Sequence, residues 1–341
     1  MSTYFEKNAP PALQDQQRLI LTGGYENGAV TKLVMHTITA EMPDMQTTQL
    51  ESDCRMMCMT SHMDKEFAQN GSTGNITMYS TDTDVLVLAC HHTPYFRNAD
   101  VFWETGTTTK YENTHRFVPV HEIAKHRGLC MMNILPHIHA LSGCDSTSGL
   151  FYVGKKTAMK IISNHGAAKF TALSALAEDD TTAAVDAARV IVSMWYDSAE
   201  KHKQLHGDLN RLRTKMASTR DIAMSRLPPC EPVFLQHVLR TMWQVRLWVN
   251  ARTPELVTGS PFEYGWETTH EGIEPVMYNC TTAAEMIDGL ACDCKGKTRC
   301  KEKCPCYVAG LPCIELCICE SEELKCHNPK TFVVESAEQN P

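Results

Sequence analysis

Nine of the sixteen cysteines lie within residues 292–326, and cysteine thiolates are ligands for soft metal ions. Their spacing is C-x-C-x5-C-x3-C-x-C-x6-C-x3-C-x-C-x6-C. A segment this short cannot bury a core large enough to fold alone, so disulfides or metal must hold it together. An odd number of cysteines suits complete internal pairing poorly, and repeated C-x-C pairs are typical of thiolates that converge on a metal. We therefore predict zinc ligation by Cys292, Cys294, Cys300, Cys304, Cys306, Cys313, Cys317, Cys319 and Cys326.

Four carboxylates form two short acidic motifs. Glu51-Ser-Asp53 opens a segment that is compatible with the start of a helix, and Asp82-Thr-Asp84 follows a predicted strand at 75–80. Carboxylates at a strand end lie at the sheet edge, where α/β folds place ligands, and they are the ligands that Mg²⁺ and Mn²⁺ prefer. The alternative for both motifs is local, because acids in a first helical turn or in a turn stabilise the backbone there.

A fifth acid, Asp145, lies between an apolar helical stretch and a glycine-bearing turn, in the sequence GCDSTSGLFYVGKKTA from residue 143 to 158. A glycine turn before a helix N-terminus offers backbone N–H groups to a phosphate, and lysines add positive charge. The spacing is not that of a Walker A loop after a strand. The candidate phosphate contacts are Gly149, Gly154, Lys155, Lys156 and Lys160.

In this order, the E-x-D pair, the D-T-D pair and G-C-D-x-T-x-G-x-x-x-V-G-K-K-T-A resemble the flap-endonuclease/XPG branch of the PIN-like nucleases. The phrases STDTDVLVLA and LSGCDSTSG are also similar to transposon-like animal proteins that carry this domain. The resemblance covers residues 18–165 and, less closely, the helices to 250. It implies an α/β fold with a PIN-like (Rossmann-like), mainly parallel sheet flanked by helices.

The same resemblance implies metal-dependent, structure-selective DNA hydrolysis with two divalent cations, Mg²⁺ or Mn²⁺. It also places Gly149, Gly154 and Lys155 in a helix–turn–helix that binds the duplex backbone. The residues that it implies as catalytic and metal-binding are Glu51, Asp53, Asp82, Asp84 and Asp145.

The N-terminal part departs from that family. The family has further metal-binding acids before its E-x-E pair, whereas only fifty residues precede Glu51, and none forms a strand-then-Asp motif. The domain therefore looks as if it starts part-way in, and the metal shell is expected to be incomplete. The alternative function is that of a catalytically inactive DNA- or chromatin-binding protein. A third hypothesis is a zinc-stabilised adaptor for protein partners.

The nine-cysteine spacing resembles the CXC or CRC module of tesmin-type DNA-binding proteins. That resemblance implies three zinc ions held by nine thiolates, which reach four-coordination only if three sulfurs are shared. Basic residues of the first loop either offset the charge of the cluster or contact phosphates. In the family an aromatic residue near the middle C-x-C pair contacts DNA. The implied DNA contacts are Lys295, Lys297, Arg299 and Tyr307.

Composition limits the remaining possibilities. The chain has 341 residues and a formal net charge of -8, so any nucleic-acid contact must come from local basic patches. No apolar run is long enough for a transmembrane helix, and the N-terminus has no secretory h-region, so we expect no membrane association. Reduced cysteines are then expected in a cytosolic or nuclear protein, and DNA binding favours the nucleus.

The predicted elements give an order of domains. Strands are expected at 18–22, 31–40, 75–80, 100–106 and 116–120, and helices at 121–129 and 232–250, among others. An apolar stripe in the last helix is expected to pack in the core. The predicted order is a tail (1–17), the PIN-like domain (18–250), a linker (251–290), the zinc module (291–328) and a tail (329–341).

Overall fold

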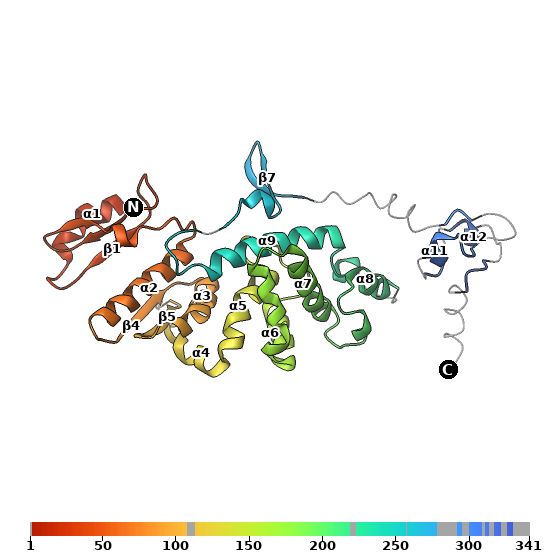
Figure 1. Cartoon of the computed structure of the whole chain (residues 1–341), viewed down its shortest axis with the longest axis horizontal. Coiled ribbons are helices and arrows are strands. Elements are labelled where there is room, and N and C mark those ends of the chain that lie inside the picture. Colours follow the sequence, from red (N-terminus) through yellow and green to blue (C-terminus); the bar gives the residue numbers. More distant parts are fainter. Residues whose placement is uncertain are drawn as a thin grey trace. The chain divides into compact units, whose positions relative to one another are not determined.

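The computed structural model describes residues 2–107, 113–218, 223–256, 258–277, 292–294, 300–308, 311–313, 317–321 and 326–329. The chain forms two compact units, Met1–Met277 and Tyr278–Pro341. Figure 1 shows the first unit as a row of helices with small sheets, and the second unit with the short helices α11 and α12. The division falls inside the predicted linker.

The first unit begins with a small antiparallel sheet. Strands β1 (Leu19–Thr22), β2 (Thr31–Val34) and β3 (Thr39–Glu41) pair in sequence order, with Leu19 opposite Val34. The predicted strand at 31–40 is therefore two strands, because the chain reverses between Val34 and Thr39.

The residues before this sheet, which the sequence predicts as a tail, contain short helices. Helix α1 (Ser2–Asn8) is followed by a 3-10 helix at Pro10–Ala12. The hydroxyl of Ser2 donates to the Gly23 carbonyl at 2.6 Å, and the Lys32 ammonium lies 2.9 Å from the Glu6 carboxylate. These contacts hold the segment on β1 and β2.

The central sheet contains the strand that precedes the D-T-D motif. Strands β4 (Gly74–Tyr79) and β5 (Ala99–Thr105) are parallel, and helix α3 (Thr83–His92) connects them. Strand β6 (Arg116–Pro119) then pairs antiparallel with β5. The fold is mixed α/β as expected. A mainly parallel sheet is not found among the described strands, because β4–β5 is the one parallel pairing there and the other pairings are antiparallel.

Helices supply most of the core of the first unit. In chain order they are α2 (Ser52–Gln69), α3, α4 (Val120–Arg127), α5 (Leu129–Leu141), α6 (Lys155–His165), α7 (Thr181–Tyr196), α8 (Leu209–Ala217) and α9 (Glu231–Val249). Helix α9 packs on α3, α5 and α7 and runs along the row of helices in Figure 1. Val238 and Met242 of its predicted apolar stripe are fully buried, whereas Leu235 is exposed. Within the described residues, no helix is both long and apolar enough to cross a bilayer.

The predicted linker at 251–290 is wrong for the part that the structure describes. A 3-10 helix at Pro261–Glu263 leads into a hairpin of β7 (Trp266–Thr269) and β8 (Gly272–Pro275). Tyr264 is buried in the core, and Trp266 packs on Trp243 edge-to-face at 6.5 Å, as the aromatic residues there predict. Burial of these rings keeps the segment on the first unit.

Two buried histidines are expected to make the first unit sensitive to acid. Burial lowers the pKa of His137 on α5 to about 3 and that of His237 on α9 to about 4. Below the ordinary pKa of 6.5 the unfolded chain binds protons that the folded chain cannot bind, so stability falls as pH decreases. At about pH 5 each such histidine should lower the free energy of unfolding by about 2 kcal/mol.

Urea unfolding near neutral pH and near pH 5 measures this effect. The variant His137→Leu removes one such titrating group and should lose less stability on acidification than the natural chain. Equal losses in the two proteins would contradict the assignment.

Candidate metal centres

All five carboxylates that the sequence predicts as metal ligands line a single cavity of about 250 Å³. No lysine or arginine contributes to its wall. Its lining residues are Glu51, Ser52, Asp53, Asp82, Asp84, Cys144, Asp145, Ser146, Gln244 and Trp248. The five acids therefore share one cavity, although they come from different parts of the chain.

Asp82 and Asp84 reach the cavity from the carboxyl end of β4. Asp82 is the N-cap of α3, and its carboxylate accepts the backbone N–H of Asp84 at 2.8 Å. Asp84 is buried in the first turn of α3, where its Oδ1 accepts a hydrogen bond from His139 Nε2 at 2.7 Å. The local capping role and the position in the cavity are thus both present for this motif.

Asp145 lies in a tight turn that follows α5. Cys144 and Thr147 form an isolated antiparallel bridge, and the Thr147 hydroxyl donates to the Ala140 carbonyl at 2.6 Å. The turn is thereby tied to the last turn of α5. Gly143 has a φ of +107°, and a Cβ there would lie 2.6 Å from the Cα of Gly149, so glycine is required for this close approach.

Glu51 is held by residues that the sequence did not single out. The amide nitrogen of Gln244 lies 2.9 Å from Oε1 and 3.1 Å from Oε2 of Glu51, and Trp248 Nε1 donates to Oε2 at 3.1 Å. The amide oxygen of Gln244 accepts a hydrogen bond from Ser146 Oγ at 2.5 Å. Gln244 therefore links Glu51 at the start of α2 to the turn that carries Asp145. In the sequence, the signal for this role was that Gln244 is a polar residue one turn before Trp248, on the core face of α9.

Replacing Gln244 by leucine is expected to weaken Mn²⁺ binding in this cavity by about 10-fold, because partners that orient metal ligands typically contribute 10- to 100-fold. Calorimetric or relaxation titration with Mn²⁺ measures the change. The matched control is Gln236→Leu on the same helix, since Gln236 does not line the cavity. Equal affinity in the two variants would show that Gln244 does not orient a ligand.

Lys155 is not available for phosphate in the way that the sequence predicts. It is half-buried, and its ammonium donates to the carbonyls of His139, at 2.5 Å, and of Gly143. Burial lowers its pKa, partly opposed by the nearby Cys144 and Asp84. Lys155 thus fastens α6 to the end of α5 beside the cavity. Lys156 and Lys160 are exposed on α6, which begins after Gly154, so they are the lysines of this group that can meet a phosphate.

Burial, together with the negative charge of its neighbours, perturbs one of the acids in the cavity. Burial raises the pKa of Asp53 to about 6, and the charges of Asp82, Glu51 and Asp84 add to this, against a hydrogen bond from Ser52. Neighbouring carboxylates disfavour each other's ionisation, and a bound cation stabilises their charged forms. The chemistry of the donor set therefore fits a hard divalent ion such as Mg²⁺ or Mn²⁺.

The five carboxylates line the cavity, but their oxygen atoms do not converge on a single point. Among the described residues, the groups of three or more potential ligands whose donor atoms lie within 4.8 Å of one another consist of cysteines. A cavity of this size leaves room for a cation that keeps several waters, as Mg²⁺ usually does.

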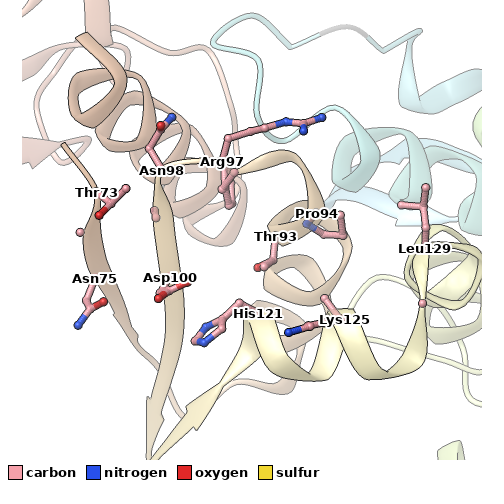
Figure 2. A pocket seen from close by; sticks show the side chains of 15 residues that line it. Thr73, Asn75, Thr93, Pro94, Arg97, Asn98, Asp100, His121, Lys125 and Leu129 are labelled. Carbon is pink, nitrogen blue, oxygen red and sulfur yellow. The ribbon is translucent and has the colours of Figure 1, made fainter. Parts of the chain in front are cut away.

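A second, larger cavity of about 720 Å³ lies at the opposite, amino-terminal ends of β4 and β5. Figure 2 shows Asn75 and Asp100 on the strands and His121 and Lys125 on α4. This cavity mixes one acid with basic and amide groups, and none of the predicted site residues lines it. Of these two cavities, the smaller one alone is lined by the predicted carboxylates.

The second unit brings the nine predicted cysteines into one cluster. Eight are buried, and Cys294 packs against them. Four sets of four sulfurs lie within 4.8 Å, and Cys292 and Cys313 each belong to three of these sets. Sulfur–sulfur distances of 3.7 Å for Cys292–Cys300 and 3.8 Å for Cys306–Cys317 match the edge of about 3.8 Å of a tetrahedron with Zn–S bonds of about 2.3 Å. No disulfide joins the described cysteines, so the cluster could hold a metal ion such as zinc.

Backbone and amide N–H donors lie beside two of the sulfurs in this cluster. Burial raises the pKa of Cys304, but the N–H groups of Tyr307 and Cys306 at the start of α11 (Pro305–Val308) and neighbouring cysteines outweigh it, and the pKa falls to about 7. Asn328 is fully buried, and its amide donates to the Cys313 sulfur at 3.5 Å. Its position two residues after the last cysteine gave no signal in the sequence.

The predicted DNA contacts of this unit are only partly described. Tyr307 lies on α11 and is exposed. Lys295, Lys297 and Arg299 lie outside the described residues. The structure therefore gives no position for the basic loop.

No family model, curated protein or solved structure matches the chain. The two clusters of potential metal ligands are accordingly the basis for assigning a function.

Proposed function

We propose that the chain is a divalent-metal-dependent, structure-selective DNA nuclease of mobile-element origin, with a zinc-bound module that contacts DNA in the nucleus. The single observation that supports this proposal is the cavity lined by Glu51, Asp53, Asp82, Asp84 and Asp145 with no lysine or arginine in its wall. Acids from three separate segments meet there, which local helix capping does not require. This arrangement is chemically suited to holding cations at a scissile phosphate.

The residues of the cavity would have distinct roles. Glu51 is fixed by Gln244 and Trp248, and Asp84 is oriented by His139, so two of the acids are held in place before any cation arrives. Asp82, Asp53 and Asp145 complete the donor set. A bound Mg²⁺ or Mn²⁺ would supply Lewis-acid polarisation of the phosphate and activation of water. The chain's own contribution is to orient these oxygens and exclude competing cationic side chains from the cavity wall.

The net charge of -8 requires separate surfaces for DNA. Lys156 and Lys160 are one helical turn apart on α6 and both are exposed, so they can contact successive phosphates. In the second unit, three zinc ions on nine thiolates would carry a formal charge of -3. The lysines and arginine of its first loop would offset that charge or contact DNA.

The second candidate is a DNA- or chromatin-binding protein without catalysis. It is favoured by the spacing of the acids, because no three carboxylate oxygens in the described residues converge within 4.8 Å. Two-metal hydrolysis needs two ions about 4 Å apart, which demands a tighter donor set. In this alternative the thiolate cluster and α6 would still bind DNA.

Cleavage assays separate the two candidates. The full chain is incubated at low salt with end-labelled flap, nicked, duplex and single-stranded DNA, and with Mg²⁺, Mn²⁺ or a chelator. The nuclease proposal predicts metal-dependent cleavage that favours the flap and disappears in the double variant Asp84→Asn, Asp145→Asn. Binding without cleavage would support the second candidate. Absence of both binding and cleavage would favour a protein-interaction adaptor.

A further inference from the structure

The loop between the Asp145 turn and α6 presents two neighbouring aromatic rings to solvent. Residues Leu150–Val153 form a tight turn in which the Val153 N–H donates to the Leu150 carbonyl at 2.9 Å. The outer residues anchor the turn, since Val153 is buried and Leu150 packs against the core. The two central residues point outward, with Phe151 56% and Tyr152 61% exposed.

Tyr152 occupies a backbone position that suits glycine. Its φ is +65°, and a turn with positive φ at the third residue favours glycine or asparagine. A side chain with a Cβ is disfavoured there by sterics, and such residues concentrate at functional sites. An exposed tyrosine gains little burial in return, so the requirement for an aromatic ring at this point is not explained by folding.

A distant arginine holds the exposed ring in place. The Arg226 guanidinium carbon lies 4.3 Å from the centre of the Tyr152 ring, and Arg226 Nη2 donates to the Tyr152 hydroxyl at 3.1 Å. Phe151 meets Tyr152 edge-to-face, with ring centres 4.7 Å apart and planes at 87°. The rings are thus oriented in advance.

The turn follows closely, along the chain, on residues that line the acidic cavity. Its preceding residue, Gly149, touches the backbone of Gly143, two residues before Asp145. After the turn, the chain enters α6 with its exposed Lys156 and Lys160. An aromatic surface therefore lies along the chain between a candidate hydrolytic site and lysines that can hold phosphates.

We infer that Phe151, Tyr152 and Arg226 form a stacking platform for an unpaired base of single-stranded DNA that enters the acidic cavity. This inference rests on the proposed function and specifies the part of the substrate that the first unit contacts. Aromatic rings bind bases of any sequence, and a guanidinium adds a cation–π contribution. The charged surroundings favour a nucleic acid over an apolar protein segment, because phosphates accompany every base.

The test uses the full chain and Ca²⁺ in place of Mg²⁺, so that binding is read without cleavage. Fluorescence anisotropy compares a labelled oligothymidylate with a blunt duplex of the same length. The variant Tyr152→Gly removes the ring and relieves the backbone, so its melting temperature should not fall. We expect its affinity for the single strand to fall about 5- to 150-fold and its affinity for the duplex to change little.

Two further variants sharpen the result. Tyr152→Phe keeps the ring and should bind within a few-fold of the natural chain. Tyr4→Ala is the matched control, because Tyr4 and Phe5 form another exposed edge-to-face pair, on α1. Unchanged single-strand affinity in Tyr152→Gly, equal losses on both DNAs, or no single-strand binding by the natural chain would each overturn the platform. Unchanged single-strand affinity in Tyr152→Gly would instead indicate that the two rings contact a protein partner. If the affinities are as expected but the chain cleaves no DNA, only the nuclease proposal is overturned.

Discussion

Replacing Asp82 by asparagine is expected to lower the rate of metal-dependent DNA cleavage by about 100- to 1,000-fold while the fold is retained. Asp82 both caps α3 and lines the acidic cavity. Asparagine caps a helix as well as aspartate does, so the hydrogen bond to the Asp84 N–H survives. What is lost is one negative charge and one good oxygen ligand. Single-turnover cleavage of a flap substrate, with urea unfolding in parallel, measures the two effects separately.

The matched control is Asp180→Asn, because Asp180 caps α7 in the same way and accepts the Ala183 N–H at 3.0 Å. Asp180 does not line the cavity, so its replacement should leave cleavage unchanged. If the two variants cleave at the same rate, Asp82 acts as a helix cap alone and the cavity is not the catalytic site.

Removing zinc is expected to unfold the cysteine-rich second unit and leave the first unit folded. Structural zinc sites contribute about 10–16 kcal/mol of apparent binding free energy, and a segment of this size has no comparable apolar core. Metal analysis of the full chain should find zinc in the native protein. After chelation, limited proteolysis should cut within residues 292–326, and added zinc should restore protection. Protection that persists without metal would contradict a metal-held unit.

Two cysteine variants should lose different amounts of bound zinc. Cys313 belongs to three of the four sulfur sets and Cys294 to one, so Cys313→Ser should lose more zinc than Cys294→Ser. Cys58→Ser serves as control, since Cys58 lies in the first unit. Equal zinc content in all three variants would show that these thiolates do not bind the metal.

The parts of the site that the sequence predicted are those whose chemistry is local. Asp82 and Asp84 follow a strand and open a helix, so their place at a sheet edge depends on a few neighbouring residues. The cysteine spacing is similarly self-contained. That Glu51 and Asp145 would join these acids was implied by a family resemblance and not by neighbouring residues; both line the cavity.

What the sequence could not predict depends on contacts between distant segments. Gln244 reaches Glu51 across 193 residues, and in the sequence it is one polar residue among the apolar residues of α9. Lys155 looked available for phosphate because nothing in GKKTA reveals the two carbonyls that it meets. The hairpin after Pro261 was missed because glycine and proline suggested a linker, whereas burial of Tyr264 decides its position.

The arrangement of the sulfur sets has a consequence for how the second unit matures in the cell. Cys292, Cys294, Cys300 and Cys304 form one set within 13 residues, whereas Cys300, Cys313, Cys319 and Cys326 form another across 27. Closing a shorter loop costs less entropy, and the compact set also leaves the ribosome first. We expect the nascent chain to capture its first ion there, and later cysteines to join a centre that already exists. Assembly would then follow the direction of translation.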